Sequence, residues 1–360
     1  MKENQINVKQ LCAIFLAFTP ITKIITAPAV FAGYCNEKLW QPILILALFD
    51  LVLFALLTRI VKKHEGKTFF EILSESFTPT FAKIIFFIYA LFFLAKSIMP
   101  IIEQKEFIEN AFYETLPKAP VFYPVFAVLF YLCIKGFKTF GRSAQICAVA
   151  TISGLALILF LSFLSGDFKT LLPLFAFSNK SSAICALNGL SWFNDAIYLF
   201  FFIGYCKLNS KGVKSTLIAY GVSTAIILLF FLTFYSIFSF VSQTQELAIN
   251  SMSIFGVTLV NVGRFDYIAL FLLAMSGTVA IAFPLIIATN CLALSFNAKN
   301  KVIPAIIVCL VIFIVVLLFS NKYEEVLKTI VTYCTPIYIL CGYILPFLGL
   351  GGKKNEIQKS

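Results

Sequence analysis

Two stretches decide the fold: residues 17–33, AFTPITKIITAPAVFAG, and residues 185–204, CALNGLSWFNDAIYLFFFIG. Each lies in an apolar run of about 20 residues, the length that a helix needs to cross the hydrocarbon of a bilayer. The first contains Pro20 and Pro28, and an interior proline removes a backbone hydrogen bond and bends or breaks a helix. The second crowds polar and small residues at mid-membrane: Asn188, Gly189, Ser191, Asn194 and Asp195. We therefore expect two discontinuous membrane helices.

The composition agrees with a membrane protein. Of the 360 residues, 60% are hydrophobic and only 12% are charged, whereas soluble domains keep about a quarter of their residues charged. Backbone groups in lipid must pair internally, and the apolar runs lack the alternation of a β-barrel. We predict a single all-α integral membrane domain over residues 1–360, with about ten transmembrane helices near 9–33, 40–60, 81–102, 121–136, 143–165, 183–205, 214–241, 266–292, 302–320 and 326–349.

The two broken helices are the first and the sixth. These places are equivalent if the chain consists of two five-helix halves, about 9–165 and 183–349, arranged as an inverted 5+5 repeat. Interrupted helices at matching places of inverted repeats point to the binding site of a transporter. The N-termini of half-helices there can bind a carboxylate, and unwound carbonyls can bind a cation.

The basic residues predict the orientation. With the N-terminus inside, eighteen of the 28 Lys and Arg residues lie in cytoplasmic segments and eight in outer ones. Cytoplasmic loops of membrane proteins carry such an excess. We expect both termini in the cytoplasm, and an even number of spans agrees with that. The net charge of +11 is spread over the ends of apolar runs, which argues against nucleic acid as a partner.

Four ionisable residues fall inside predicted spans: Lys23, Asp50, Lys96 and Asp195. A charge in hydrocarbon costs roughly 2.5–3.5 kcal/mol on insertion scales and therefore faces a cavity or a partner. Lys23 and Asp195 favour a polar site, and an ion or proton relay through Lys23, Asp50 and Asp195 is the alternative to structural pairing. For Lys96, which lies toward the outer end of its span, we expect snorkelling to the interface.

Three other segments carry expectations. The basic loop 61–80 predicts a short cytoplasmic helix. The acidic segment 103–118 has Phe107, Ile108, Phe112 and Leu116 at helical spacing, which predicts an interfacial helix or a helix that binds a partner. In the eighth span, the small residues Ser276, Gly277 and Thr278 favour close helix packing over ion binding.

The sequence offers few of the residues that bind metal ions or carry out nucleophilic catalysis. The chain has one histidine, and its ten cysteines include no C-x-x-C pair. No cluster of His, Cys or paired carboxylates gathers at one membrane face, which argues against a membrane enzyme. We expect no cofactor.

Several motifs in order resemble the spore germination permeases, the B subunits of nutrient germinant receptors in the amino acid–polyamine–organocation superfamily. The similar stretches are HEGKTFFEIL at 64–73, LPKAPVFYPVFAVLFYLCIKGFKTFGRSAQI at 116–146, LLPLF at 171–175, FND at 193–195 and VGRFDYIALFLLAMSG at 262–277. Each is unspecific alone, but their order and spacing from about Ile6 to Phe347 are specific. Asp195 stands where the family has an acidic residue.

The resemblance implies an inverted-repeat permease fold that binds an amino acid or similar small nutrient at mid-membrane, between spans 1, 3, 6 and 8. It also implies an A-type membrane subunit and a C-type lipoprotein as partners in the spore inner membrane. The candidate contacts are Thr19, Pro20, Ile21, Thr22 and Lys23 from the first span, and Ser191, Trp192, Phe193, Asn194 and Asp195 from the sixth.

The chain departs from the family pattern at two places. Pro20-Ile21-Thr22-Lys23 occupies a break where the family usually has glycine, and Leu272 or Leu273 stands where it tends to have tryptophan. In related proton-coupled carriers a lysine ammonium replaces a bound sodium ion, a role open to Lys23. The alternative function is an independent proton-coupled transporter of an amino acid or polyamine.

Overall fold

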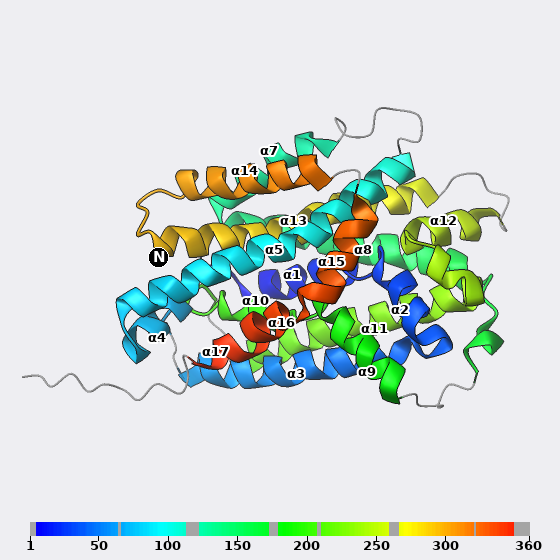
Figure 1. The fold of residues 1–360 in the computed structure, drawn as a ribbon, viewed down its shortest axis with the longest axis horizontal. Helices are drawn as coiled ribbons and strands as arrows, with labels where there is room; N and C mark the ends of the chain where they lie inside the picture. Colours follow the sequence, from blue (N-terminus) through cyan, green and yellow to red (C-terminus); the bar gives the residue numbers. More distant parts are fainter. Residues whose placement is uncertain are drawn as a thin grey trace, which may run out of the picture.

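The chain folds into a bundle of helices (Figure 1). The computed structural model describes residues 5–63, 66–112, 122–172, 179–206, 210–258, 266–319 and 322–348. Its helical elements are α1 (Val8–Ile21), α2 (Ala27–Cys35), η2 (Asn36–Lys38), α3 (Trp40–Lys63), α4 (Phe69–Ser76), α5 (Pro79–Phe112), α7 (Pro124–Lys135), α8 (Phe137–Phe163), η3 (Phe168–Leu171), α9 (Asn179–Asn188), η4 (Gly189–Ser191), α10 (Ala196–Phe200), α11 (Ser210–Phe238), η5 (Ser239–Thr244), α12 (Ala248–Thr258), α13 (Asp266–Ser295), α14 (Val302–Phe319), α15 (Tyr323–Tyr333), α16 (Thr335–Ile339), the π-helix η6 (Leu340–Ile344) and α17 (Leu345–Leu348).

The first predicted span is broken, as expected. α1 ends one residue after Pro20, and α2 begins at Ala27 with Pro28 in its first turn, where a proline needs no backbone donor. In the break, which we call break 1 (residues 22–26), the Thr22 hydroxyl donates to the carbonyl of Phe18 at 3.1 Å. The Phe18 carbonyl also accepts from the Thr22 backbone amide at 3.2 Å. The Thr22 hydroxyl lies 3.2 Å from the Thr19 carbonyl as well, which has lost its usual backbone donor because the Lys23 amide bonds to Pro20 instead.

The sixth predicted span is broken as well. α9 runs into the 3₁₀ turn η4, and the helix resumes only with α10, so residues 189–195 form break 2. Asn194 has a φ of 72°, the left-handed conformation that asparagine tolerates better than most residues. The two discontinuities predicted from the sequence are therefore confirmed.

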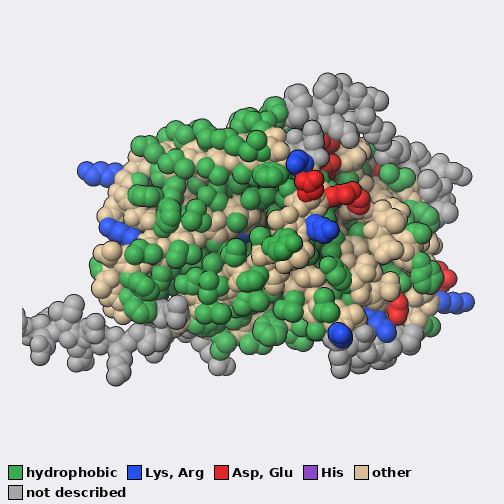
Figure 2. Space-filling model, in the orientation of Figure 1, with side chains coloured by type: hydrophobic (Ala, Val, Ile, Leu, Met, Phe, Trp, Pro, Cys, Tyr) green, Lys and Arg blue, Asp and Glu red, His purple; other side chains and the backbone are tan. Residues whose placement is uncertain are grey.

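The membrane-crossing helices are α3, α5, α8, α11 (with η5), α13 and α14, which are long and apolar enough by themselves. The pair α15 with α16–α17 makes a seventh span if it is counted as one, and it bends by 56°. The two broken spans and the short α7 fall below that length, so the count of ten stays a prediction. Hydrophobic side chains cover the middle of the molecule while charged ones lie toward its ends (Figure 2), which is the surface of a multi-pass membrane protein.

α13 lies at the centre of the bundle and packs against α5 and α8. A side chain at Gly277 would overlap the Gln104 side chain of α5. Next to it, the Ser276 hydroxyl donates to the Cys147 carbonyl of α8 at 3.1 Å. The packing interpretation of these small residues is confirmed.

The short helix expected in the basic loop is α4. Thr68 caps it, because its hydroxyl accepts from the Glu71 amide while the Glu71 carboxylate accepts from the Thr68 amide. Gly204, with a φ of 82°, lies so close to Thr68 that a Cβ would be 2.9 Å from its backbone. The chain after break 2 thus holds α4 at the same end of the bundle as the N-terminus (Figure 1).

Two expectations are wrong. The acidic segment 103–118 does not start an interfacial helix, because α5 continues through it to Phe112 with Glu103, Lys105 and Glu109 buried. Lys105 pairs there with Glu109 at 2.8 Å, so these two charges neutralise each other inside the protein. Leu116 lies outside the described residues. Lys96 does not snorkel either: its side chain is buried in the bundle.

Candidate functional site

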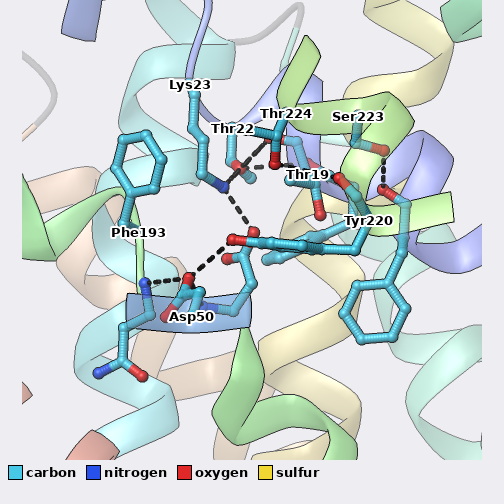
Figure 3. A network of polar contacts seen from close by, with 12 residues as sticks. Thr19, Thr22, Lys23, Asp50, Phe193, Tyr220, Ser223 and Thr224 are labelled. Atoms are coloured by element: carbon cyan, nitrogen blue, oxygen red, sulfur yellow. Dashed lines mark hydrogen bonds and ion pairs between the residues drawn. The ribbon is translucent and has the colours of Figure 1, made fainter. Parts of the chain in front are cut away.

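The centre of the site is an ion pair between the two breaks. The Lys23 ammonium lies 2.7 Å from Asp195 Oδ2, and neither side chain is exposed. The same ammonium donates to the Thr19 carbonyl at 3.1 Å and to the Thr22 hydroxyl at 3.3 Å, as Figure 3 shows. The Phe193 ring lies 5.1 Å from it, within cation–π range. The lysine therefore fills break 1 and joins it to break 2.

Asp50 of α3 fixes break 2 from the other side. Its Oδ2 accepts from the backbone amides of Asn194 at 3.1 Å and Asp195 at 2.9 Å. The Tyr220 hydroxyl donates to Oδ2 of the same carboxylate (Figure 3), and the Tyr343 hydroxyl donates to Oδ1. Four donors satisfy this buried charge, which favours the structural interpretation of Asp50.

Lys96 of α5 binds the backbone of break 2. Its ammonium donates to the Phe193 carbonyl at 2.7 Å, and the rings of Tyr198 and Tyr338 lie 5.7 and 5.3 Å from it. Lysine ammonium groups thus bind a carbonyl at each break: Lys23 binds that of Thr19 in the last turn of α1, just before break 1, and Lys96 binds that of Phe193 in break 2.

Glu103, one turn further along α5 than Pro100, reaches both breaks. Its Oε1 accepts from the Trp192 indole at 2.9 Å and from the Thr26 hydroxyl. Its other oxygen, Oε2, is buried with no hydrogen-bond partner among the described residues.

A small cavity lies between these groups. It measures about 10 Å³ and is lined by Phe18, Thr22, Lys96, Met99, Pro100, Glu103, Ser191, Trp192 and Tyr198, so that it has room for about one water molecule. We call it the central cavity. The first, third and sixth spans line it, while α13, the eighth span, touches it only indirectly through Phe283, which stacks on Tyr198 at 4.3 Å.

A larger cavity lies at the end of the bundle that the charge pattern predicts to be outer. We call it the vestibule: it measures about 340 Å³, and its polar lining is Thr26, Tyr34, Gln243, Glu246, Tyr323 and Glu324. Burial and the neighbouring Glu324 carboxylate raise the pKa of Glu246. Thr26 belongs to the vestibule and also bonds to Glu103 of the central cavity, so this contact separates the two spaces.

The ten candidate contacts divide into three groups. Thr22, Ser191 and Trp192 line the central cavity. Lys23 and Asp195 form the ion pair beside it, while the others support the breaks: Thr19 and Phe193 by their carbonyls, Asn194 by its amides, and Pro20 and Ile21 by burial in the last turn of α1.

The sequence analysis assigned neither Lys96 nor Glu103 to the site: Lys96 was expected to snorkel, and Glu103 lay beyond the predicted end of the third span. Their positions carried a signal, because Lys96, Met99, Pro100 and Glu103 follow one another at the spacings that place residues on one face of a helix.

Among the described residues, no group of three His, Cys, Asp or Glu side chains could hold a metal ion. The site instead offers the ammonium groups of Lys23 and Lys96, the carboxylates of Asp50, Glu103 and Asp195, and aromatic walls. Such a set suits a small charged or zwitterionic organic molecule.

Solved structures of similar fold are transporters. Crystal structures of two single-residue mutants of the Eremococcus coleocola manganese transporter match with a TM-score of 0.64 and 10% identity, over 95% of this chain and 78% of that chain. The same transporter in complex with an aromatic bis-isothiourea substituted compound matches with a TM-score of 0.61 and 12% identity, over the same shares of both chains. At such identity the likeness shows the fold alone.

The search of curated proteins found no match. The family described as spore germination protein matches residues 5–326. The chain is a permease-type membrane protein and belongs to the spore germination permease family.

Proposed function

We propose that this chain is the permease-like subunit of a nutrient germinant receptor. It binds an amino acid or similar small nutrient in the central cavity and triggers spore germination together with an A-type membrane subunit and a C-type lipoprotein. The observation that carries the proposal is the central cavity itself, which lies between two helix breaks and is lined by Thr22 and Ser191. Family membership supports the same role.

The mechanism is a shift between conformations. In the described conformation the cavity holds about one water molecule, so a nutrient requires the breaks to move apart. A ligand that binds the expanded state better shifts the population toward it. The inverted repeat of halves 9–165 and 183–349 makes such movement a rocking of one half against the other, which partner subunits in the spore inner membrane sense.

Lys23 determines whether a cation binds together with the nutrient. Its ammonium binds the Thr19 carbonyl next to break 1 and pairs with Asp195. In related carriers a bound cation lies at the place that this ammonium takes. A nutrient then binds without a coupling cation.

A test is thermal stabilisation of the purified protein by a panel of amino acids, sugars and polyamines. A ligand that binds only the folded state stabilises it by about 2.7 kcal/mol at a hundredfold excess over Kd. We expect one nutrient class to stabilise the wild type but not Ser191→Leu, which fills the cavity. Ser153→Leu is the matched control, since Ser153 is exposed on α8. Equal stabilisation of both variants would place the ligand elsewhere, and none in the wild type would refute binding by this chain alone.

The second candidate, a proton-coupled transporter, is favoured by one observation. Asp195 Oδ1 is buried without a hydrogen-bond partner among the described residues, so this oxygen is free to accept from a proton-bearing group of a relay. Lys23 and Asp50 are the neighbouring relay groups. Accumulation of a radiolabelled amino acid or polyamine in vesicles that contain only this chain would support transport. A receptor subunit binds without accumulating.

A further inference from the structure

Glu103 combines three features that no other described side chain of the central cavity shares. It is a carboxylate with 1% exposure, and it lines the cavity. Only one of its oxygens is bonded: Oε1 accepts from Thr26 and Trp192, while Oε2 has no partner among the described residues. A buried carboxylate oxygen without a donor is costly, so a group that donates to it gains binding energy.

The location of Glu103 connects the central cavity with the vestibule. The Thr26 hydroxyl that it binds is part of the vestibule wall, and Trp192 is part of the cavity wall. A donor that competes for the carboxylate weakens both contacts at once. A ligand on the Glu103 carboxylate therefore loosens the contact that separates the central cavity from the vestibule.

The charges around the breaks indicate the class of that donor. Three buried carboxylates, Asp50, Asp195 and Glu103, face two buried ammonium groups, Lys23 and Lys96. Asp195 is paired with Lys23, and Asp50 is satisfied by four donors. Among the described residues Glu103 has only neutral partners, the hydroxyl of Thr26 and the indole of Trp192, so it lacks a positive group beside it. Glu246 and Glu324 in the vestibule wall add a negative potential along the approach.

We propose that Glu103 is the subsite for an ammonium group of the ligand, which binds the unpaired Oε2 and so weakens the contact of Oε1 with Thr26. The inference rests on the proposed function, because it names the group by which the nutrient is recognised in the central cavity. Compounds that carry the ammonium group bind, and their counterparts without it do not.

The test uses two matched sets of probes on the purified full-length chain. They are L-alanine with ethylamine and propionate, and L-leucine with isoamylamine and 4-methylpentanoate. We expect at least one amino acid and its amine to raise the melting temperature of the wild type, whereas the matching carboxylate leaves it unchanged. Glu103→Gln keeps the shape but loses the charge, and it should bind the amine roughly tenfold more weakly or worse.

Glu109→Gln is the matched control. Glu109 is equally buried on the same helix, and one of its oxygens is also without a partner among the described residues, but it pairs with Lys105 and does not line the cavity. This variant should bind like the wild type. Glu103→Asp restores the charge and should recover part of the affinity.

Three results would overturn the ammonium subsite: equal affinity of Glu103→Gln and wild type, binding of the carboxylates as tight as that of the amino acids, or no response to any amine. The first two leave the proposed function standing, since a nutrient still binds. If Glu103→Gln does not fold, Thr26→Val decides. It frees Oε1 from one donor and should tighten amine binding, and unchanged or weaker binding would refute the proposal.

Discussion

The ion pair of Lys23 and Asp195 shows how single residues hold two broken helices together. Each break leaves backbone groups unpaired in a setting without water, and such groups cost several kcal/mol in lipid. Lys23 pairs one such carbonyl and also links the two breaks, since its ammonium binds the Thr19 carbonyl and the Asp195 carboxylate. The pair therefore stabilises both breaks in the described conformation.

Replacing one member of this pair should lower the stability of the protein more than replacing both members together. Lys23→Met alone or Asp195→Leu alone leaves an uncompensated buried charge and should lower the free energy of unfolding by about 3–5 kcal/mol. The double variant should be more stable than either single variant, because no charge remains. Denaturation in detergent micelles measures all four proteins of the cycle. If the two losses simply add, the residues do not interact in the folded protein.

At this scale the sequence predicted part of the site. Lys23, Asp50 and Asp195 stood out because charges in apolar runs are rare. Lys96 also stood out, but its place near the end of a span suggested snorkelling, and only the fold shows the Phe193 carbonyl within its reach. Glu103 was missed because the end of a membrane helix cannot be judged from charge alone when the charge is buried by neighbours.

At the scale of elements, the tenth span is attached to break 2. α15 and α16 meet at a bend, and the π-helix η6 follows, a feature that often marks functional sites. The Asn194 side-chain amide donates to the Tyr338 carbonyl at 3.0 Å, and Tyr343 donates to Asp50. Movement of break 2 therefore has to move this span too.

Gly342 in η6 tests that attachment. A Cβ there would overlap the Asn194 side chain, so Gly342→Ala must displace the amide from Tyr338 and should destabilise the protein by about 1–3 kcal/mol. Gly221→Ala in α11 is the control, since nothing lies within 4 Å of its added Cβ, and the change should stabilise the helix by roughly 0.5–1 kcal/mol. Thermal unfolding of both variants gives the comparison. Equal effects would mean that the tenth span packs loosely on the break.

An element could be predicted from the sequence where residues within the element itself determine its structure. Pro20 and the polar cluster of break 2 act within their own helices, so both breaks were found. The capping box of Thr68 and Glu71 also acts locally, and α4 was found. The length of α5 and the π-helix depend on packing with distant segments, such as Gln104 against Gly277, and no local pattern shows them.

At the scale of the whole molecule, the two ends of the bundle differ in what lies between them and the central cavity. Toward the predicted outer end, the vestibule reaches Thr26, and its contact with Glu103 lies between the vestibule and the central cavity. Toward the predicted cytoplasmic end, aromatic rings fill the bundle: Phe69 of α4 packs on Phe86, Tyr89, Phe200 and Phe201. If the protein binds a ligand in the central cavity, as proposed above, the vestibule is the approach that the described conformation favours.

That direction depends on the predicted orientation, which cysteine labelling can test. Gln243 in the vestibule wall and Glu75 on α4 are both exposed, and they lie at opposite ends of the bundle. With a membrane-impermeant maleimide, Gln243→Cys should be labelled in intact cells and Glu75→Cys only in inside-out vesicles. The wild type gives the background, since seven of its ten cysteines are buried. The reverse pattern would turn the vestibule toward the cytoplasm, and the acidic approach to Glu103 would then serve a ligand from inside the cell.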